Sequence, residues 1–282
     1  MRGTIAFLLA LSSLFAQDTL KHARELYERT DYKASLAVLA DIAKPMGEDY
    51  CLIGQNHFML GDYKKATDAF QKARALEPGN SEYAHWLGRS FGRRAETSNI
   101  LTAPMHASKA RQFFEEAVAL DPSNEEALND LFDYYLEAPG MLGGGFDKAE
   151  QVAKRIAARN PAEGHFAAAQ LADKRKQYDS AEQHLRKAME LAPRQVGRVI
   201  DLAKYLAKRG RLEESEAVFN HAEEVEPNSP KVCFARARVY VEEKRNLDRA
   251  KSLLIKYLQS DLTPDDPPKE QAEKLLKQVS GV

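Results

Sequence analysis

The sequence predicts an all-α fold built from helix-turn-helix units that repeat along the chain. Three observations predict it: a returning pattern of small, apolar and proline residues, apolar side chains spaced three and four residues apart, and turn residues between the copies. Spacings of three and four place side chains on one face of a helix. A generic helical bundle would show the same spacing, but not a pattern that returns about every 34 residues.

The returning pattern marks the second helix of each unit. A small residue is followed by an aromatic or aliphatic residue four positions later, by Ala after three more and by Pro after another five. Full copies begin at Ala66, Ala110, Ala181 and Ser215, and looser copies begin at Ser35, Ala149 and Ala250. Because Pro cannot continue a helix, each Pro predicts the end of one unit and the start of the next.

The first helix of each unit carries a second pattern. It reads Tyr50-x2-Ile53-Gly54-x2-His57 in one unit and Ala84-x2-Leu87-Gly88-x2-Phe91 in the next. Both stretches resemble the Trp-x2-Leu-Gly-x2-Tyr stretch of the tetratricopeptide repeat family, and the chain looks similar to secreted bacterial members of undefined role. The resemblance implies a right-handed superhelical solenoid of about seven helix-turn-helix repeats. The small residues Gly54 and Gly88 are expected to let the two helices of a unit approach closely.

The repeats divide the chain into a leader, a solenoid and a closing segment. The solenoid is expected over residues 17–259, and residues 260–282 are expected to hold a linker and a C-terminal capping helix that covers the last apolar face. The expected units are residues 17–46, 47–80, 81–124, 125–161, 162–195, 196–229 and 230–259.

Residues 1–16 have the layout of a secretory signal peptide. Met1-Arg2-Gly3 is a short basic start, residues 5–11 are apolar, and the segment ends on the small residue Ala16. This order predicts cleavage after Ala16 and a periplasmic or secreted protein. The apolar run is too short to cross a bilayer, so we expect no integral membrane span after cleavage. An uncleaved membrane anchor is the alternative.

Charge and composition limit the classes of ligand. Lys and Arg number 41 against 42 Asp and Glu, so the basic excess that DNA or RNA requires is missing and no nucleic-acid partner is expected. Cys51 and Cys233 lie in distant units, so a disulfide between them is not expected. The histidines form no metal-binding motif and no cofactor motif is found, so we expect neither a metal nor a cofactor.

Two units are longer than the others, and each insertion falls between the first and second helices. Residues 92–108 and 138–145 are therefore expected to be loops that neighbour each other along one edge of the solenoid. In the second insertion, Gly143-Gly144-Gly145 precedes a helix start, where bare backbone N–H groups can hold an anion. No phosphate-binding motif accompanies it, so a sharp turn is the simpler interpretation.

Charged and aromatic residues flank the first insertion. Arg89 and Arg93 lie one helical turn apart, near His85 and the chain's single Trp, Trp86. One interpretation is a pocket for an anionic or aromatic group, with Trp86 turned toward a binding groove because it lies one position off the usual core slot. The other is that these side chains form ion pairs with acids of the next unit, such as Asp133, and tie the insertions to the scaffold.

The family resemblance implies that the first helices line a groove that takes extended or helical peptides. The residues expected to bind a protein or peptide partner are His85, Trp86, Arg89, Arg93, Asn129, Asp133, Phe166 and Gln170. The same register places Leu52, Gln55, Phe58, Met59, Asp130, Asp201, Lys204, Phe234 and Arg238 in the groove.

The sequence favours an exported, non-catalytic scaffold that binds a protein or peptide through this groove and the two insertions. The alternatives are a small-ligand binder and a structural protein of envelope assembly. An enzyme would have to use His85, His106, Asp130 or Asp133, and no ordered catalytic set accompanies them. We therefore expect no catalytic residues.

Overall fold

The structure, a computed structural model, describes residues 17–280. These residues form helices joined by turns, and the predicted all-α repeat fold is confirmed. The chain divides into two compact units, Met1–Gly144 and Gly145–Val282, which we call the N-terminal unit and the C-terminal unit. Their boundary passes through the repeat expected at residues 125–161. The signal peptide expected at residues 1–16 lies outside the described residues.

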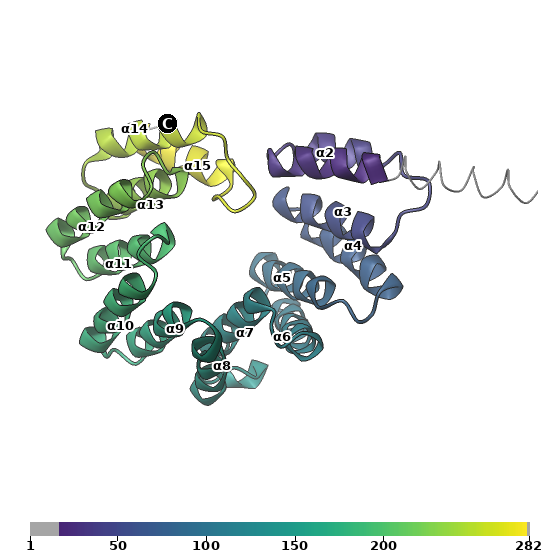
Figure 1. The fold of residues 1–282 in the computed structure, drawn as a ribbon, viewed down its shortest axis with the longest axis horizontal. Coiled ribbons are helices and arrows are strands. Elements are labelled where there is room, and N and C mark those ends of the chain that lie inside the picture. The colour runs from purple at the N-terminus through teal and green to yellow at the C-terminus, as the bar shows by residue number, and fades with distance from the viewer. Residues whose placement is uncertain (1–16, 281–282) are drawn as a thin grey trace, which may run out of the picture. The chain divides into compact units, whose positions relative to one another are not determined.

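In the N-terminal unit, successive helices pack side by side as helical hairpins (Figure 1). A helix at residues 17–28 comes first. It is followed by α2 (Tyr32–Leu39), α3 (Gly47–Met59), α4 (Tyr63–Leu76), α5 (Ser81–Thr97), α6 (Ala103–Leu120), α7 (Glu125–Glu137) and the short 3-10 helix η1 (Gly140–Leu142).

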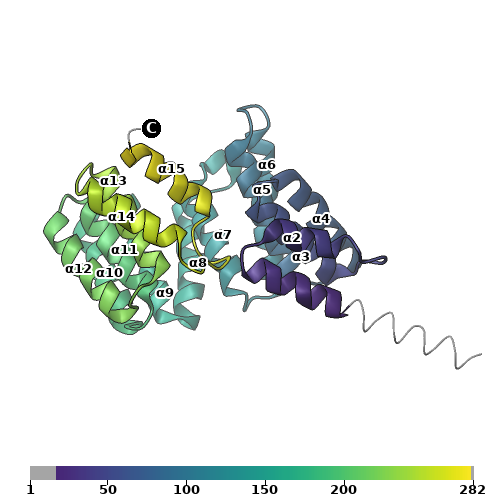
Figure 2. The same cartoon turned by 90° about the horizontal axis from the view of Figure 1, so that it is seen from above.

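The C-terminal unit continues the same arrangement of paired helices. Its elements are α8 (Phe146–Arg159), α9 (Pro161–Lys174), α10 (Tyr178–Leu191), α11 (Val196–Lys208), α12 (Leu212–Val225), α13 (Pro230–Glu242), α14 (Leu247–Leu258) and α15 (Lys269–Ser280). Figure 2 shows α15 lying against α13 and α14, on which its buried residue Ala272 packs. Within residues 17–280, no helix is both long enough and apolar enough to span a bilayer.

Small residues hold the two helices of a hairpin close together. A Cβ atom at Gly54 would lie 2.6 Å from the ring of Phe70, and one at Gly88 would overlap the ring of Phe114. In α9, the corresponding residue Ala169 is 2% exposed and lies in one core cluster with Leu185. The pairing of a smaller first-helix residue with a larger second-helix residue therefore sets the spacing of each hairpin.

The starts of α5, α7 and α9 are fixed by side chains that accept hydrogen bonds from free backbone N–H groups. The side-chain oxygen of Asn80 accepts from the N–H groups of Glu82 and Tyr83 at the start of α5. Asn124 and Asn160 act in the same way at the starts of α7 and α9. These are the turn residues between copies of the repeat.

The first insertion is helix rather than loop, which corrects the expectation for residues 92–108. Helix α5 continues to Thr97 and α6 begins at Ala103, so only residues 98–102 connect them. No proline interrupts residues 92–97, and Pro104 lies in the first turn of α6, where its missing N–H costs no helical hydrogen bond. The extra residues therefore lengthen both helices of the hairpin.

The second insertion is a compact turn. Gly143 has φ +86°, and a Cβ atom at Gly144 would overlap the carbonyl oxygen of Ala138. The Tyr134 hydroxyl donates to the carbonyl of Leu142 at 2.9 Å and fixes the turn to α7. The sharp turn expected from the glycine run is therefore present, with glycine at positions that a larger side chain would strain.

A charge cluster around one buried arginine joins α12 to α13 in the C-terminal unit. Arg236 is fully buried, and its guanidinium pairs with Glu216 and with Glu223. The Tyr240 hydroxyl donates to Glu216, and Arg249 lies 2.9 Å from the same carboxylate. Burial favours the neutral acid, but the hydrogen bonds from Arg236 and Tyr240 outweigh it and hold the pKa of Glu216 below its usual value.

The two cysteines are both free and buried, one in each unit. Cys51 lies on α3 with its Sγ atom 3.9 Å from the Glu82 carboxylate. Cys233 lies on α13 in the core cluster that contacts the capping helix.

Candidate functional site

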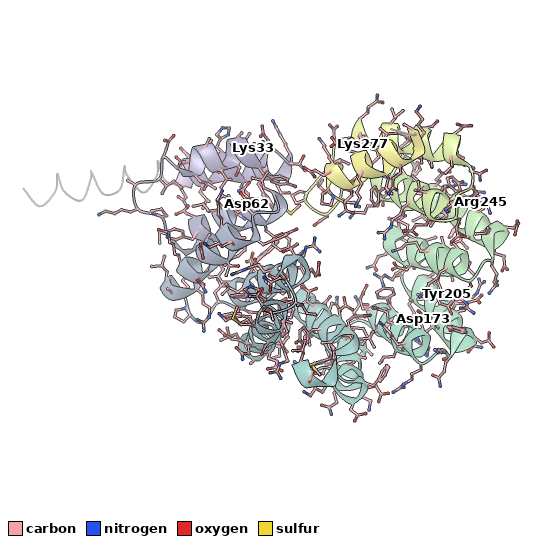
Figure 3. The ribbon with its side chains drawn as sticks, turned by 180° about the vertical axis from the view of Figure 1, so that it is seen from behind. Lys33, Asp62, Asp173, Tyr205, Arg245 and Lys277 are labelled. Atoms are coloured by element: carbon pink, nitrogen blue, oxygen red, sulfur yellow. The ribbon has the colours of Figure 1, made fainter. Side chains whose placement is uncertain are left out.

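The C-terminal unit contains a cavity of about 860 Å³, which we call the C-terminal cavity. Its principal walls are the first helices α9, α11 and α13. These supply the residues that the repeat register placed in a groove, namely Phe166, Gln170, Asp201, Lys204, Phe234 and Arg238. Figure 3 labels two further wall residues, Tyr205 and Asp173. The structure thus brings together the predicted groove residues of this unit.

The C-terminal cavity combines aromatic surface with charges of both signs. The Arg198 guanidinium covers the Phe166 ring at 3.9 Å and lies 3.3 Å from Asp201. Burial raises the pKa of the Asp201 carboxyl, against the opposing effects of Arg198 and Lys204. Lys204 itself is exposed in the wall. Such a lining can bind an apolar side chain and a neighbouring charge of either sign.

The segment before α15 forms another wall of the C-terminal cavity. Asp265, Asp266 and Pro267 line it. Asp266 accepts hydrogen bonds from the backbone N–H of Thr263 at 2.9 Å and from its hydroxyl at 3.0 Å. The hydroxyl of Tyr257 donates to the Pro267 carbonyl. The capping segment therefore also shapes the cavity, a role that its sequence did not indicate.

The N-terminal unit contains a smaller cavity of about 470 Å³, which we call the N-terminal cavity. Arg89, Arg93 and Asp133 line it, as do residues from both insertions, including Glu96 and Leu142. The prediction that the two insertions are neighbours is therefore confirmed. Three of the predicted binding residues meet in this cavity.

The charged residues of the N-terminal cavity contact other residues of the same unit. Arg89 lies 3.8 Å from Asp130, and its guanidinium lies 4.3 Å from the ring of Trp86. Arg93 pairs with Glu96 and donates to the hydroxyl of Tyr63 at 3.2 Å. These contacts agree with the interpretation in which ion pairs tie the insertions to the scaffold.

Trp86 is part of the core, which corrects the expectation that it turns toward a groove. It is 9% exposed, stacks on Phe70 with ring centroids 5.5 Å apart and meets the edge of Phe58 at 5.3 Å. Its aromatic partners lie on α3 and α4, so the sequence of α5 alone could not predict that they enclose it. Leu52 was also placed in the groove but is buried in the core.

His85 is 2% exposed and is held by acids of α7. Its Nε2 atom lies 2.7 Å from Asp130, and its Nδ1 atom lies 3.9 Å from Glu126. Asn129 is partly exposed and lies outside the linings of both cavities. His85 therefore joins two helices, and of the predicted binding residues in this unit only the two arginines and Asp133 line the cavity.

The remaining candidates for chemistry are dispersed. His106 is 6% exposed beside Phe91, and its pKa is lowered by burial and by the nearby charges of Arg94 and Lys109. His165 and His184 form a pair with their Nδ1 atoms 2.9 Å apart. In the part of the chain that the structure describes, no three His, Cys, Asp or Glu side chains gather as a metal site would require.

Each unit contains a segment that matches a known repeat. Residues 47–80 and residues 174–232 match models of the tetratricopeptide repeat. Helices α3 and α4 form the repeat at 47–80, and the longer match includes α11 and α12. A fold that contains tetratricopeptide repeats suggests a protein-interaction scaffold. No curated protein sequence matches the chain.

Solved structures share this repeat fold. The tetratricopeptide repeat protein TTC0263 of Thermus thermophilus is 20% identical, with a TM-score of 0.55 over 67% of the present chain and 98% of that chain. A tetratricopeptide repeat protein of Parabacteroides merdae is 16% identical, with a TM-score of 0.58 over 94% and 98%. Human IFIT1 is 18% identical, with a TM-score of 0.57 over 86% of the present chain and 54% of IFIT1. At these identities the likeness concerns the fold alone.

Proposed function

We propose that the protein is an exported, non-catalytic scaffold that binds a peptide segment of a partner protein in the C-terminal cavity. The observation that carries the proposal is the lining of this cavity. Three successive first helices each place an aromatic or polar residue and a charged or amide residue along one surface, with Phe166 and Gln170 on α9 as an example. A surface that repeats in this way fits a chain of repeating units, as a peptide is.

The lining also indicates which peptide side chains would bind. Phe166, which is partly exposed, offers apolar contact, while Lys204 and Arg238 offer positive charge at exposed positions. Arg238 lies 2.7 Å from Glu242, so its charge is partly balanced already. Lys204 is therefore the stronger attraction for an acidic side chain or a carboxylate, and the Phe166 ring favours an apolar residue next to it.

Export is the second component of the proposal and rests on residues 1–16. The basic start, the apolar run and the small residue Ala16 support a cleaved signal peptide. Sequencing the N-terminus of the protein from its native envelope tests this component alone. A mature chain that begins at Gln17 is the expected result, and a chain that begins at Met1 in the cytoplasm would refute export without affecting peptide binding.

Site-specific photo-crosslinking tests the binding site. The photoreactive residue p-benzoylphenylalanine is placed in turn at Lys204, at Arg238 and at Ile255, which is 39% exposed on α14 outside the cavity lining. Each protein is irradiated in native envelope extract, and the crosslinked peptide is sequenced. We expect one partner segment to be captured from Lys204 and Arg238 and not from Ile255.

The captured segment is then synthesised and titrated into the purified protein. We expect Lys204→Ala to weaken its binding about tenfold, a loss of about 1.4 kcal/mol. Lys187→Ala is the matched control, because Lys187 lies on α10 outside the cavity lining and pairs with Glu190. Equal crosslinking from Ile255, or binding that is unchanged by Lys204→Ala, would exclude the C-terminal cavity as the site.

A further inference from the structure

The α5–α6 hairpin is longer than its neighbour in the N-terminal unit. Helix α5 has 17 residues and α6 has 18, whereas α3 has 13 and α4 has 14. At about 1.5 Å per residue, the four extra residues on each helix extend the hairpin by about 6 Å. Figure 2 shows the loop between α5 and α6 projecting beyond the helices beside it. We call residues 97–108 the hairpin tip.

The hairpin tip exposes large apolar side chains and carries no charged residue. Ile100 is 87% exposed, Leu101 is 86% exposed and Met105 is 50% exposed. Residues 97–108 contain no Asp, Glu, Lys or Arg, although these residues make up 29% of the chain. Adjacent exposed Ile and Leu at a projecting loop are unusual for a surface that only water contacts.

The exposure of the tip is built into its local structure. The side-chain oxygen of Asn99 accepts hydrogen bonds from the N–H groups of Leu101 at 3.0 Å and of Thr102 at 3.1 Å. These bonds hold residues 99–102 in a tight turn, and Pro104 lies in the first turn of the next helix. The apolar side chains therefore project from an ordered turn, without contributing to the core of the unit.

Two positively charged side chains lie behind the tip, one on each helix. Arg94 lies on α5 with its guanidinium 5.2 Å from the Phe91 ring, and Lys109 lies on α6 with its Nζ atom 5.1 Å from the same ring. Neither forms an ion pair within residues 17–280. Lys109 is one helical turn from Met105, so positive charge directly follows the apolar surface.

We propose that the hairpin tip docks the protein on an anionic lipid bilayer, with Ile100, Leu101 and Met105 in the headgroup–acyl boundary and Arg94 and Lys109 at the lipid phosphates. An apolar end with cations behind it is the arrangement that binds the surface of an anionic membrane. The absence of charge from residues 97–108 matches it, because charged side chains are costly to place in the apolar layer.

A bilayer fits the tip better than a protein groove does. The tip is convex and contributes only two helix ends, so it offers little area to a partner that must be recognised by shape. The cations behind it belong to two different helices, and this separation favours a partner surface whose negative charge is spread over its area. The proposal does not depend on peptide binding, which concerns the C-terminal unit.

Vesicle flotation with the full-length purified chain tests the proposal. Vesicles of phosphatidylcholine alone are compared with vesicles that contain phosphatidylglycerol in addition. We expect the protein to float with the anionic vesicles, and we expect the bound fraction to fall when NaCl is raised to high ionic strength. The variant Ile100→Ser/Leu101→Ser should lower the partition coefficient at least tenfold on anionic vesicles.

Two further variants separate the apolar and the electrostatic contributions. Arg94→Gln/Lys109→Gln should lower binding several-fold on anionic vesicles and leave binding to phosphatidylcholine unchanged. The matched control is Leu76→Ser/Leu191→Ser, which removes two apolar side chains that are 55% and 46% exposed elsewhere. It should bind as the wild type does.

Three outcomes overturn the proposal. The wild type fails to float with anionic vesicles, or Ile100→Ser/Leu101→Ser floats as the wild type does. The third is self-association in solution that depends on Ile100 and Leu101 while the protein ignores vesicles, which would assign the tip to a second copy of the chain. Circular dichroism confirms that each variant keeps its helices, so that lost binding is not lost folding.

Discussion

The two units are built from the same helical hairpins but use their first helices differently. In the N-terminal unit, Trp86 and Phe58 pack together, Arg89 covers them, and Asp130 holds both Arg89 and His85. The cavity that remains has about 470 Å³, against about 860 Å³ in the C-terminal unit. The same register of a repeat can therefore supply contacts within the unit or a surface that is open to a ligand.

The departures from the repeat pattern and the larger cavity lie in different units. The longer hairpin and the glycine turn both belong to the N-terminal unit, whose first-helix residues are largely occupied by one another. The larger cavity belongs to the unit that keeps the regular pattern. A departure from a repeat pattern thus identifies where the scaffold has changed, which need not be where the larger of these two cavities lies.

The largest effect is expected from removing the buried arginine of the C-terminal unit. Arg236→Ala leaves Glu216 and Glu223 without their shared cation, and we expect the free energy of unfolding to fall by about 3 kcal/mol. Urea unfolding followed by circular dichroism measures it. Hydrogen exchange should show the loss in α11–α14. The control Arg238→Ala, on the exposed side of the same helix, should cost under about 0.5 kcal/mol, and equal losses would contradict the prediction.

A close helix contact gives the matching test in the N-terminal unit. Gly88→Ala drives a methyl group into the Phe114 ring, and we expect a loss of about 2 kcal/mol in unfolding free energy. Adding Phe114→Leu should recover much of it, because Ala and Leu share this contact at Ala169 and Leu185. The melting temperatures of the single and double variants measure the recovery. A double variant no more stable than Gly88→Ala would show that the ring is not the obstacle.

The difference between the two units predicts that replacing a first-helix cation lowers stability in the N-terminal unit but not in the C-terminal unit. Arg89→Ala removes the cation over Trp86, so we expect about 1 kcal/mol less stability and a shift of Trp fluorescence to longer wavelength. Lys204→Ala should leave the free energy of unfolding within about 0.5 kcal/mol of the wild type and weaken only peptide binding. If both variants lose stability equally, the first-helix cations of both units contribute to folding, and the proposed difference between the units is wrong.

The smallest effect is expected at Asp201 and depends on pH. Because the folded protein raises the pKa of this carboxyl above its unfolded value, ionisation destabilises the fold as the pH rises through the folded pKa. Asp201→Asn should therefore raise the melting temperature at pH 7 by about 2 °C. The gain should disappear below the ordinary carboxyl pKa, where Asp201 is protonated in both states. Melting curves at pH 7 and pH 3 test the sign, and a gain at both values contradicts it.

The sequence was sufficient for the features that repeat. The recurring small residues predicted a close approach of the two helices of a unit, and this approach occurs where Gly54 meets Phe70 and where Gly88 meets Phe114. The same register placed Phe166 and Gln170 in the wall of one cavity. These predictions succeed because one helical pair sets the geometry of the next.

The sequence was not sufficient where a residue's partners come from other parts of the chain. Trp86 lies one position from a core slot, yet Phe58 and Phe70 enclose it from two other helices. In the sequence, Arg236 resembles an arginine exposed to solvent. In the structure it pairs with Glu216, which lies twenty residues earlier on α12. The length of residues 92–108 indicated an insertion but not its conformation, since added residues can extend helices as readily as a loop.

The placement of one buried thiol in each unit has a chemical consequence. Burial raises the pKa of Cys51, as does the nearby Glu82 carboxylate, and burial also raises the pKa of Cys233. Both sulfurs are therefore held as unreactive thiols, because the thiolate is the nucleophile that attacks oxidants and disulfides. A thiol-specific reagent can modify either sulfur only when its own unit opens. The modification rate at Cys51 therefore reports the opening of the N-terminal unit, and the rate at Cys233 reports the opening of the C-terminal unit. In an oxidising compartment, the same burial protects the chain from forming disulfide crosslinks to neighbouring molecules.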